Sequence, residues 1–562
     1  MLLSNMELLA TAPGGVAKLR ELILTLAVQG KLVPQDPADE PAGVLLQKIR
    51  AEKDRLIAEG KIKRDKPLAE IAEEEKPFEL PQGWEWASLG DVGLVGSSSR
   101  VHQSDWKSAG VPFYRAREIV KLSKDGRVQN DLFISEELFA NLGKGGWVPE
   151  VNDIMITGVG TIGVPYVVKA EDRFYFKDAS VLIFKNYGRL DPSYLFLFMQ
   201  SPLWIDCIHE HSMGTTVDTL TIARANATPI PLPPLAEQSR IVTRVEALMR
   251  LCDALEAKGR LEAAQHAQLV STLLGTLTAS TTPEELAANW QRVALHFDLL
   301  LDRPEAIDAL EQTLLQLAVR GLLVPQDPTD EPASALLQKI RAEKDRLITT
   351  GQIKRDKPLR PITDEEKPFE LPVGWEWVRV GSVGVTQTGG TPSSSKPEFF
   401  DGEFPFIGPG QITPSGEILQ PEKFISELGC AESAVAEPGD ILMVCIGGSI
   451  GKCVCAPFAT AFNQQINAIR PLVALSEFVL IAMKATDFVS AVLSTATGSA
   501  TPIISKGKWD LLLLPMPPLA EQSRIVTRIT ALRRLCADLR QRLAEREAVQ
   551  ARLAEALVES VG

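Results

Sequence analysis

The sequence has few of the residues that disulfide frameworks, zinc sites and histidine-based active sites require. Its seven cysteines are scattered, odd in number and never arranged as Cys-x-x-Cys, which argues against disulfide pairing and against a zinc ribbon. Cys445, Cys453 and Cys455 could in principle meet around a metal, but buried reduced thiols in a β-rich segment are the favoured interpretation. With only five histidines, a catalytic histidine centre has little to draw on. We expect no metal site and no catalytic residues.

Long apolar runs and an excess of positive charge are also absent. No stretch reaches the ~18 apolar residues that a membrane span needs, and the N-terminus has no basic segment before an apolar run, so a cytoplasmic location is expected. The net charge of −13 argues against a protein that binds a polyanion alone. Segregated positive charge or partner subunits could still supply such binding.

The chain contains two copies of the same arrangement. At 562 residues it is too long for one core. Residues 26–86 match residues 317–377 at 48 of 61 positions, and residues 233–252 match residues 517–536 at 17 of 20. The segments between these repeats, 87–232 and 378–516, share little sequence, and we call them the first and second dissimilar blocks. Uniform drift after a duplication would have spread the differences evenly, so the contrast favours one shared mechanical role and two recognition tasks.

Each repeat after a Pro-Pro pair predicts a long helix. Apolar residues at 241, 245, 248, 252 and 255 alternate in steps of four and three, and the second copy repeats this from 525 to 543. This spacing suits a coiled-coil seam, and a helix over 519–556 would reach ~57 Å. For one copy alone, an amphipathic helix on its own core is the simpler explanation, but two copies favour a helix pair related by a pseudo-two-fold axis. Segments 45–57 and 336–348 predict shorter charged helices.

The dissimilar blocks predict α/β or α+β domains with short strands. Residues 153–157 and 440–445 have the length and apolarity of strands, and residues 194–199 and 478–483 favour helices. A Gly-Trp-Glu-Trp sequence at 83–86 and 374–377 marks where each domain begins.

Two glycine motifs resemble nucleotide-binding loops without meeting their requirements. Residues 158–163 fit Gly-x-Gly-x-x-Gly, with Asp178 twenty positions beyond the first glycine, which taken alone suggests dinucleotide or S-adenosylmethionine binding. The glycines lead into the β-rich Val-Pro-Tyr-Val-Val rather than a helix, so a tight turn between two strands is favoured. The Gly-Lys pair at 451–452 resembles the end of a Walker A loop, but the first glycine and the Ser/Thr that such a loop requires are absent.

Three repeated sequences resemble the conserved regions of specificity subunits of Type I restriction–modification systems. They are Leu-Ala-Val-Gln-Gly-Lys-Leu-Val-Pro-Gln-Asp-Pro, Leu-Pro-x-Gly-Trp-Glu-Trp and Pro-Pro-Leu-Ala-Glu-Gln-Ser-Arg-Ile-Val. The Gly-Gly-Thr-Pro-Ser run at 389–393 is similar to a common opening of their target-recognition domains, whereas the first block has Gly-Ser-Ser-Ser-Arg at 96–100. The resemblance covers nearly the whole chain.

The resemblance implies an α+β fold with two α/β-type target-recognition domains, separated by two long antiparallel coiled-coil-like helices, and an internal pseudo-two-fold repeat. The implied domains are an N-terminal helical extension (1–80), the first target-recognition domain (81–232), a central conserved helical region (233–370), the second target-recognition domain (371–516) and a C-terminal conserved helix (517–562). The N-terminal extension is expected to complete the helical unit that begins at the C-terminus.

The resemblance also implies a non-catalytic role. Each target-recognition domain would read one half of a bipartite site in double-stranded DNA, and the helices would set the spacer and dock two methyltransferase subunits. Those subunits would use S-adenosylmethionine for adenine N6-methylation, and restriction (motor and nuclease) subunits would add ATP- and Mg-dependent translocation and cleavage. No cofactor is expected in this chain.

Candidate DNA contacts are polar and basic residues of the dissimilar blocks. In the first block, residues 97–127 hold seven basic and three acidic residues, a net charge of +4, and side chains of these types read base edges. The candidates are Ser98, Ser99, Arg100, His102, Gln103, Lys107, Arg115, Arg117 and Lys121 in the first block, and Gly390, Thr391, Ser393, Ser394, Lys396, Gln464, Lys506 and Lys508 in the second. Solvated loop positions are the alternative for each of them.

Candidate partner contacts are the apolar positions of the two long helices: Ile241, Val245, Leu248, Ile525, Ile529 and Leu532. Two other functions stay open at this point. One is a tandem scaffold that binds protein or nucleic acid without any link to DNA modification. The other is a standalone methyltransferase that uses residues 158–163, which S-adenosylmethionine binding by the isolated chain would reveal.

Overall fold

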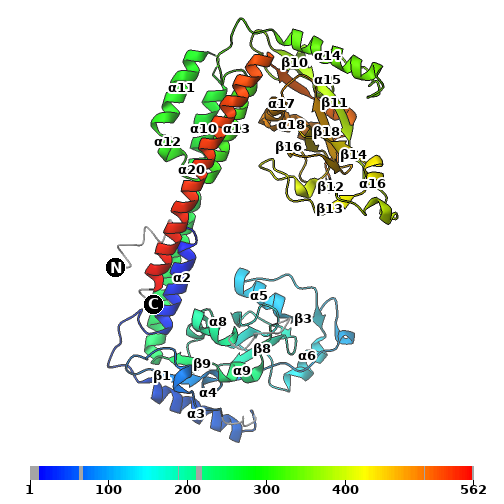
Figure 1. Cartoon of the computed structure of the whole chain (residues 1–562). Helices are drawn as coiled ribbons and strands as arrows, with labels where there is room; N and C mark the ends of the chain where they lie inside the picture. Colours follow the sequence, from blue (N-terminus) through cyan, green and yellow to red (C-terminus); the bar gives the residue numbers. More distant parts are fainter. Residues whose placement is uncertain are drawn as a thin grey trace. The chain divides into compact units, whose positions relative to one another are not determined.

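The computed structural model describes residues 12–62, 68–187, 189–209, 218–280, 282–498 and 500–559 (Figure 1). Its internal contacts divide the chain into two units. The first unit comprises Met1–Leu261 with Glu547–Gly562, and the second comprises Glu262–Arg546. Each unit therefore holds one copy of both repeats and one dissimilar block.

Two long helices follow the Pro-Pro pairs, as predicted. Helix α10 (Leu235–Thr278) has 44 residues and α20 (Leu519–Glu559) has 41, which at 1.5 Å per residue gives lengths of about 66 and 62 Å. Helix α10 begins in the first unit and ends in the second, whereas α20 begins in the second and ends in the first. The two helices therefore run antiparallel, which confirms that part of the predicted fold.

In the first unit, helix α2 (Gly15–Val28) packs on both long helices. Its buried leucines share a core with Ile241, Val245 and Cys252 of α10 and with Ala554 of α20. The Lys18 ammonium lies 2.7 Å from the Glu555 carboxylate near the end of α20. The N-terminal helix thus contacts the C-terminal end of the chain.

In the second unit, helix α13 (Pro304–Val319) takes the place that α2 has in the first. It shares a core with Ile525, Ile529 and Cys536 of α20 and with Leu274 of α10. Two further helices, α11 (Pro283–Leu295) and α12 (Phe297–Leu300), connect α10 to α13. The charged repeats form α3 (Ala42–Ala58) and α14 (Ala333–Thr349), as predicted.

The described residues of the first dissimilar block form three small sheets. Its outer pair is β1 (Glu85–Ser88) with β9 (Pro229–Leu232), antiparallel, at the two ends of the block. The four-stranded sheet has the order β2 (Leu94–Gly96), β8 (Val181–Lys185), β5 (Ile154–Thr157) and β6 (Pro165–Val167). The three-stranded sheet has the order β4 (Phe133–Ile134), β3 (Val111–Tyr114) and β7 (Tyr175–Phe176). The helices are α4 (Leu89–Val92), α5 (Ala116–Asp125), α6 (Glu136–Gly143), α7 (Pro192–Phe198), α8 (Pro202–His209) and α9 (Ile222–Ala227).

The second dissimilar block repeats this topology. Its outer pair is β10 (Glu376–Arg379) with β19 (Leu513–Met516). The first four-stranded sheet has the order β11 (Gly384–Thr388), β18 (Ile466–Pro471), β15 (Ile441–Val444) and β16 (Cys453–Cys455). The second has the order β13 (Lys423–Ile425), β12 (Phe404–Ile407), β17 (Thr460–Phe462) and β14 (Ala434–Ala436). The helices are α15 (Val380–Val383), α16 (Glu427–Ala431), α17 (Ser476–Lys484), α18 (Thr486–Thr495) and α19 (Lys506–Trp509).

The two blocks therefore share one plan despite their unlike sequences. The sheet β2-β8-β5-β6 of the first block and the sheet β11-β18-β15-β16 of the second have the same strand order. In the other sheet of each block, β3–β7 and β12–β17 are the parallel pairs. Only β14 has no counterpart among the strands of the first block that the structure describes.

Contacts between the repeats explain why their sequences are nearly identical. The buried Glu237 carboxylate accepts hydrogen bonds from the Trp84 indole N–H at 3.0 Å and from the Gln35 amide at 3.3 Å. In the second unit Glu521 accepts from Trp375 at 2.9 Å and from Gln326 at 3.1 Å. A buried carboxylate needs such donors because burial without them is costly. Each unit thus joins its Gly-Trp-Glu-Trp sequence to the first turn of its long helix.

The glycines at 158–163 form a turn, as the sequence predicted. They connect β5 to the antiparallel strand β6, and Gly160 and Gly163 have φ values of +80° and +77°, which glycine adopts at little cost. The Trp204 indole N–H donates to the Gly163 carbonyl at 3.0 Å. The loop that would bind a phosphate in a nucleotide site is therefore part of a hairpin and packs on α8.

Cys453 and Cys455 are free thiols in strand β16 of the second block, and Cys445 is a free thiol directly after β15. Burial raises the pKa of both Cys445 and Cys453 to about 12, so both are protonated at neutral pH. Within the described ranges no group of His, Cys, Asp and Glu side chains is arranged to hold a metal. Among the same residues no single helix has the length and apolarity to cross a membrane, and the bent pair α17 and α18 passes by length and composition only.

Candidate nucleic-acid interface

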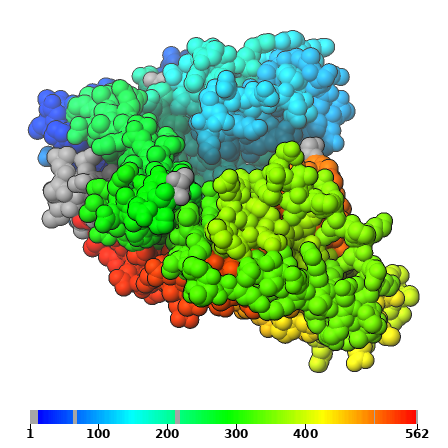
Figure 2. Space-filling view, turned by 90° about the horizontal axis from the view of Figure 1, so that it is seen from above, coloured from blue at the N-terminus to red at the C-terminus, as the bar shows by residue number. Residues whose placement is uncertain are grey.

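The candidate stretch of the first block, residues 97–127, runs from the end of β2 through β3 to the end of α5. Most of its polar side chains are at the surface, and the segment is visible in light blue in the space-filling view (Figure 2). The stretch as a whole is therefore exposed, although the structure uses its basic residues in two different ways.

Arg115 and Arg117 are engaged within the domain. Both guanidinium groups contact the Glu118 carboxylate, Arg115 at 3.0 Å, and both reach Asp131, at 2.8 and 3.0 Å. Burial raises the pKa of Glu118, but the hydrogen bonds from Arg115 and Arg117 outweigh this and hold its pKa below the usual range. The net positive charge of the stretch is thus partly neutralised by Asp131, just outside it, and these two arginines orient the start of α5.

Arg100, Lys107 and Lys121 are in a different situation. Their side chains are exposed, and they form no ion pair with any residue in the described part of the chain. His102 and Gln103 are exposed beside them, at the start of a short 3₁₀ turn (Gln103–Asp105) that Asp105 closes by accepting from the His102 backbone N–H. These five side chains remain available for phosphates or bases.

The two serines differ in the same way. The Ser98 hydroxyl donates to the Phe176 carbonyl at 2.7 Å, so it holds the loop to β7. The Ser99 backbone N–H donates to the Tyr175 hydroxyl at 3.0 Å, and Ser99 is exposed.

In the second block, two candidate stretches that are far apart in sequence come together. The loop after β11 lies against residues 462–464, and the Thr391 hydroxyl donates to the Gln464 side-chain oxygen at 2.5 Å. A Cβ on Gly389 would lie 2.0 Å from the Asn463 carbonyl oxygen, so only glycine fits. Ser433 also donates to the Gly390 carbonyl at 2.7 Å. Thr391 and Gln464 thus form one polar surface.

The rest of this loop is exposed. Ser393 and Ser394 face solvent, the Ser393 hydroxyl lies 2.8 Å from that of Ser395, and the Lys396 ammonium lies 4.9 Å from the centre of the Phe399 ring. Small hydroxyl side chains and a lysine on an exposed loop suit base and phosphate contacts.

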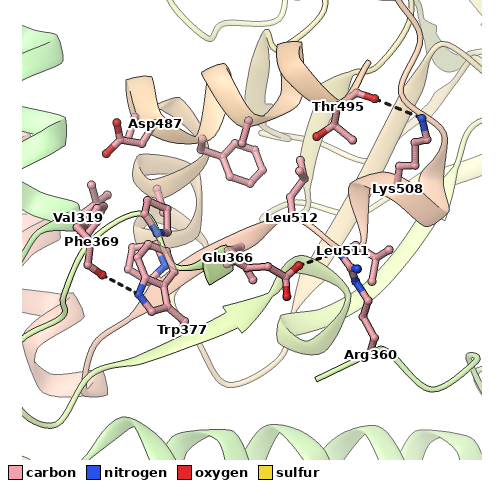
Figure 3. A pocket seen from close by; sticks show the side chains of 17 residues that line it. Val319, Arg360, Glu366, Phe369, Trp377, Asp487, Thr495, Lys508, Leu511 and Leu512 are labelled. Atoms are coloured by element: carbon pink, nitrogen blue, oxygen red, sulfur yellow. Dashed lines mark hydrogen bonds and ion pairs between the residues drawn. The ribbon is translucent and has the colours of Figure 1, made fainter. Parts of the chain in front are cut away.

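Lys506 and Lys508 lie elsewhere in the domain. The Lys506 ammonium pairs with Asp510 at 2.8 Å, and the Lys508 ammonium donates to the Thr495 carbonyl at 3.4 Å. Lys508 lines a pocket of about 370 Å³ with apolar walls that include Trp377, Phe488 and Leu512 (Figure 3). Neither lysine forms a hydrogen bond or ion pair with the loop at 389–396 within the described chain.

The polar groups of that pocket are already paired. Glu366 binds Arg360 at 2.7 Å, and the Trp377 indole N–H donates to the Phe369 carbonyl at 3.2 Å (Figure 3). Outside the pocket lining, Arg379 also binds Glu366 at 2.9 Å. Such pairing holds the segment before Gly-Trp-Glu-Trp to the domain. It is a structural arrangement rather than a set of groups converging on a substrate.

The apolar residues predicted to bind partners lie in the cores of the chain itself. Ile241, Val245, Ile525 and Ile529 are at most 2% exposed, and Leu248 and Leu532 are half-buried at the edges of the two cores. The heptad pattern thus located the helix stripes correctly, but in this structure those stripes pack on α2 and α13. A partner would have to use the opposite faces of α10 and α20.

Those opposite faces hold residues that the sequence reasoning missed. Several exposed positions carry the same residue in both copies, among them Thr243 and Thr527, Arg244 and Arg528, Arg250 and Arg534, and Leu251 and Leu535. Identity at solvent-facing positions is not required by the core, and this was the signal available in the sequence.

Comparison with known proteins agrees with this arrangement. The family "Type I restriction modification DNA specificity domain" matches twice, at residues 81–266 and 372–546. The specificity subunit of the Type I restriction enzyme EcoAI from Escherichia coli is 35% identical over 97% of this chain and 94% of its own. That of EcoEI, also from Escherichia coli, is 40% identical over 68% of this chain and 64% of its own.

A solved structure of a Type I restriction–modification system includes a chain that is 22% identical, with a TM-score of 0.48, over 86% of this chain and 99% of that one. The two family matches together cover more than half of the sequence, and each contains one dissimilar block and the beginning of one long helix. The chain belongs to the family of Type I restriction–modification DNA specificity subunits.

Proposed function

We propose that each dissimilar block reads one half of a bipartite site in double-stranded DNA, and that the chain directs the catalysis of partner subunits without catalysing a reaction itself. The observation that carries this proposal is the shared strand order of two blocks with unlike sequences, each mounted on a nearly identical scaffold. One docking geometry with two different surfaces is what two half-sites of unrelated sequence require.

The first half-site would be read by the surface around Arg100, His102, Gln103, Lys107 and Lys121. Their side chains are exposed and, for the three cations, unpaired within the described chain. The second would be read by the loop at 390–396 together with Gln464, which the structure brings into contact with Thr391. Arginine and glutamine can form bidentate contacts with guanine and adenine, and lysine binds phosphates.

The long helices would separate the two half-sites and dock two methyltransferase subunits. Exposed residues that are identical in both copies, such as Arg244 and Arg528, support docking of the same partner twice. S-adenosylmethionine would be bound by those subunits, and ATP and Mg by the restriction subunits that complete the complex. The complex would act in the cytoplasm, where the DNA is.

Genome-wide mapping of N6-methyladenine tests this function. Cells that express the chain with a methyltransferase subunit encoded beside it are compared with cells that lack only the chain. A split motif that is methylated only when the chain is present is the expected result. Absence of any new motif, with a methyltransferase that is active alongside another specificity subunit, would contradict the proposal.

A further inference from the structure

The two helical interfaces of the chain are built alike. In the first unit α2 packs on the first part of α10, and in the second α13 packs on the first part of α20. The alignment of residues 26–86 with 317–377, extended towards the N-terminus without a gap, pairs Leu19 with Leu310. The alignment of residues 233–252 with 517–536 pairs Ile241 with Ile525. The same positions of both interfaces are buried.

The apolar parts of these interfaces are similar in the two helix pairs, although the buried Leu22 of α2 aligns with the buried Thr313 of α13. On α2 and α13 the buried positions hold leucine in both copies at Leu19 and Leu310 and again at Leu26 and Leu317, with Ile23 matched by Leu314. The long helices present the same set twice, as Ile241 and Ile525 and as Cys252 and Cys536. Hydrophobic burial is non-directional, so α2 would fit the stripe on α20 nearly as well as the stripe on α10.

The charges at one position of each interface are reversed. In the first unit the Arg20 guanidinium on α2 lies 2.7 Å from Asp253 and 3.5 Å from Glu256 of α10. In the second unit the aligned residue on α13 is Glu311, and it lies 2.9 Å from Arg540 of α20, which aligns with Glu256. Arg540 also binds Asp308 of α13 at 2.6 Å. The same geometry therefore holds an ion pair of opposite polarity in each unit.

Exchange of the partners would bring like charges together. On α20, Arg20 would face Arg540 and Arg533, which takes the place of Met249, while Asp253 is replaced by Ala537. On α10, Glu311 would face Asp253 and Glu256. A half-exposed ion pair contributes little stability, yet a charge pattern that attracts one partner and repels the other discriminates between them, as in coiled coils.

We propose that Arg20 with Asp253 and Glu256, and Glu311 with Arg540 and Asp308, form a pairing code that directs α2 to α10 and α13 to α20. The code matters whenever the repeated interfaces can be exchanged, during folding of one chain or between two copies of it. Duplicated helices without such a code would allow domain-swapped association of two copies.

Two variants give both units the same code while keeping an ion pair in each. In the first, R20E/D253A/E256R gives the first unit the polarity of the second. In the other, D308A/E311R/R533M/R540E gives the second unit the polarity of the first. A structural role alone predicts near wild-type behaviour for both, because every interface keeps its attraction. The pairing code predicts that discrimination is lost in both.

The full-length chains are refolded from urea at several concentrations. Their association state is measured by light scattering, and a photo-crosslinking amino acid at position 17 reports the helix that α2 contacts. Position 17 aligns with Asp308, which contacts Arg540, so it faces the coded position. Crosslinked peptides from α10 mark correct pairing, and peptides from 530–543 of α20 mark exchange.

We expect each same-code variant to raise the 530–543 crosslinks several-fold and to lower the fraction of monomer as the concentration increases. Combining all seven substitutions inverts both codes and should return both measurements to wild-type values. If the same-code variants match the wild type, or if the combined variant exchanges more than either parent, the pairing code is wrong.

Discussion

At the scale of single residues, burial and pairing separate basic side chains that look equivalent in the sequence. The prediction that residues 97–127 carry excess positive charge counted Arg115 and Arg117 with Arg100 and Lys107. Nothing in the local sequence indicates that Asp131 returns to bind both arginines or that Glu118 is buried beneath them. Such long-range pairing depends on the packing of α5 and the strand at 133–134, and spacing alone does not reveal it.

The two kinds of basic residue should respond differently to alanine. We expect weaker binding of the assembled complex to DNA in each of the variants Arg100→Ala, Lys107→Ala and Lys121→Ala. Where a phosphate contact is lost, the slope of log K against log salt concentration should fall in magnitude by about one. Folding should be unaffected because these side chains are exposed. Fluorescence anisotropy at several salt concentrations measures this, and unchanged affinity for all three would remove them from the interface.

Arg115→Ala should act on stability instead. Its removal leaves the buried Glu118 carboxylate with fewer donors, at a cost of about 1–3 kcal/mol in the free energy of unfolding. Arg100→Ala serves as the matched control, with no expected loss. Equal stability of the two variants, measured by urea unfolding, would show that the Glu118 network does not support α5.

Gly389 gives a steric test of the second loop. In Gly389→Ala the new Cβ would overlap the Asn463 and Phe462 carbonyl oxygens, which should cost about 1–3 kcal/mol and impair reading of the second half-site. Gly410→Ala is the control, because a Cβ there meets nothing within 4 Å. Equal melting temperatures and equal methylation for both variants would contradict the close approach of the two stretches.

At the scale of elements, the repeats are explained by contacts that the sequence could suggest only as identity. The predicted helices at 45–57, 336–348, 194–199 and 478–483 are confirmed, as is the turn at 158–163. Local periodicity and glycine placement determine such elements. The role of Glu521 required the structure, since its partners Trp375 and Gln326 lie 146 and 195 positions away.

The buried Glu521 makes a pH-dependent contribution to stability. Burial raises its pKa, against the opposing hydrogen bonds from Gln326 and Trp375. The folded chain therefore holds this proton more tightly than the unfolded chain, and the group adds stability as the pH falls from neutral through its raised pKa toward the ordinary value of 4.5.

Glu521→Gln removes that titration and places an NH₂ group against one of the two donors. We expect a loss of about 1 kcal/mol at pH 7, and the gap to the wild type should widen as the pH falls toward 5. Urea unfolding at several pH values measures the gap. A gap that is constant or narrows on acidification would contradict the assigned pKa shift.

The lengths of α10 and α20 lead to a prediction about the spacer. Deleting seven residues from each helix at aligned positions, such as 257–263 and 541–547, removes about 10 Å of helix, the rise of about three base pairs at ~3.4 Å each. The methylated motif should have a shorter spacer, or activity should be lost. Full activity on the original spacer would show that the helices do not set it.

At the scale of the whole molecule, the duplicated plan could be predicted from sequence and the recognition surfaces could not. Two near-identical scaffolds with unlike inserts implied two units and an α+β fold, and the structure and the family agree. Which bases are read depends on loop conformations, such as the contact between Thr391 and Gln464, and on how DNA is docked and bent. A single sequence carries neither.

Each dissimilar block is proposed to read one half-site independently of the other. Replacing residues 87–232 with the corresponding block of another family member, and mapping N6-methyladenine in cells that contain the methyltransferase subunit, tests it most directly. The expected motif has one new half, the original second half and the original spacer. A change in both halves, or an unchanged motif in a complex that still methylates DNA, would contradict it.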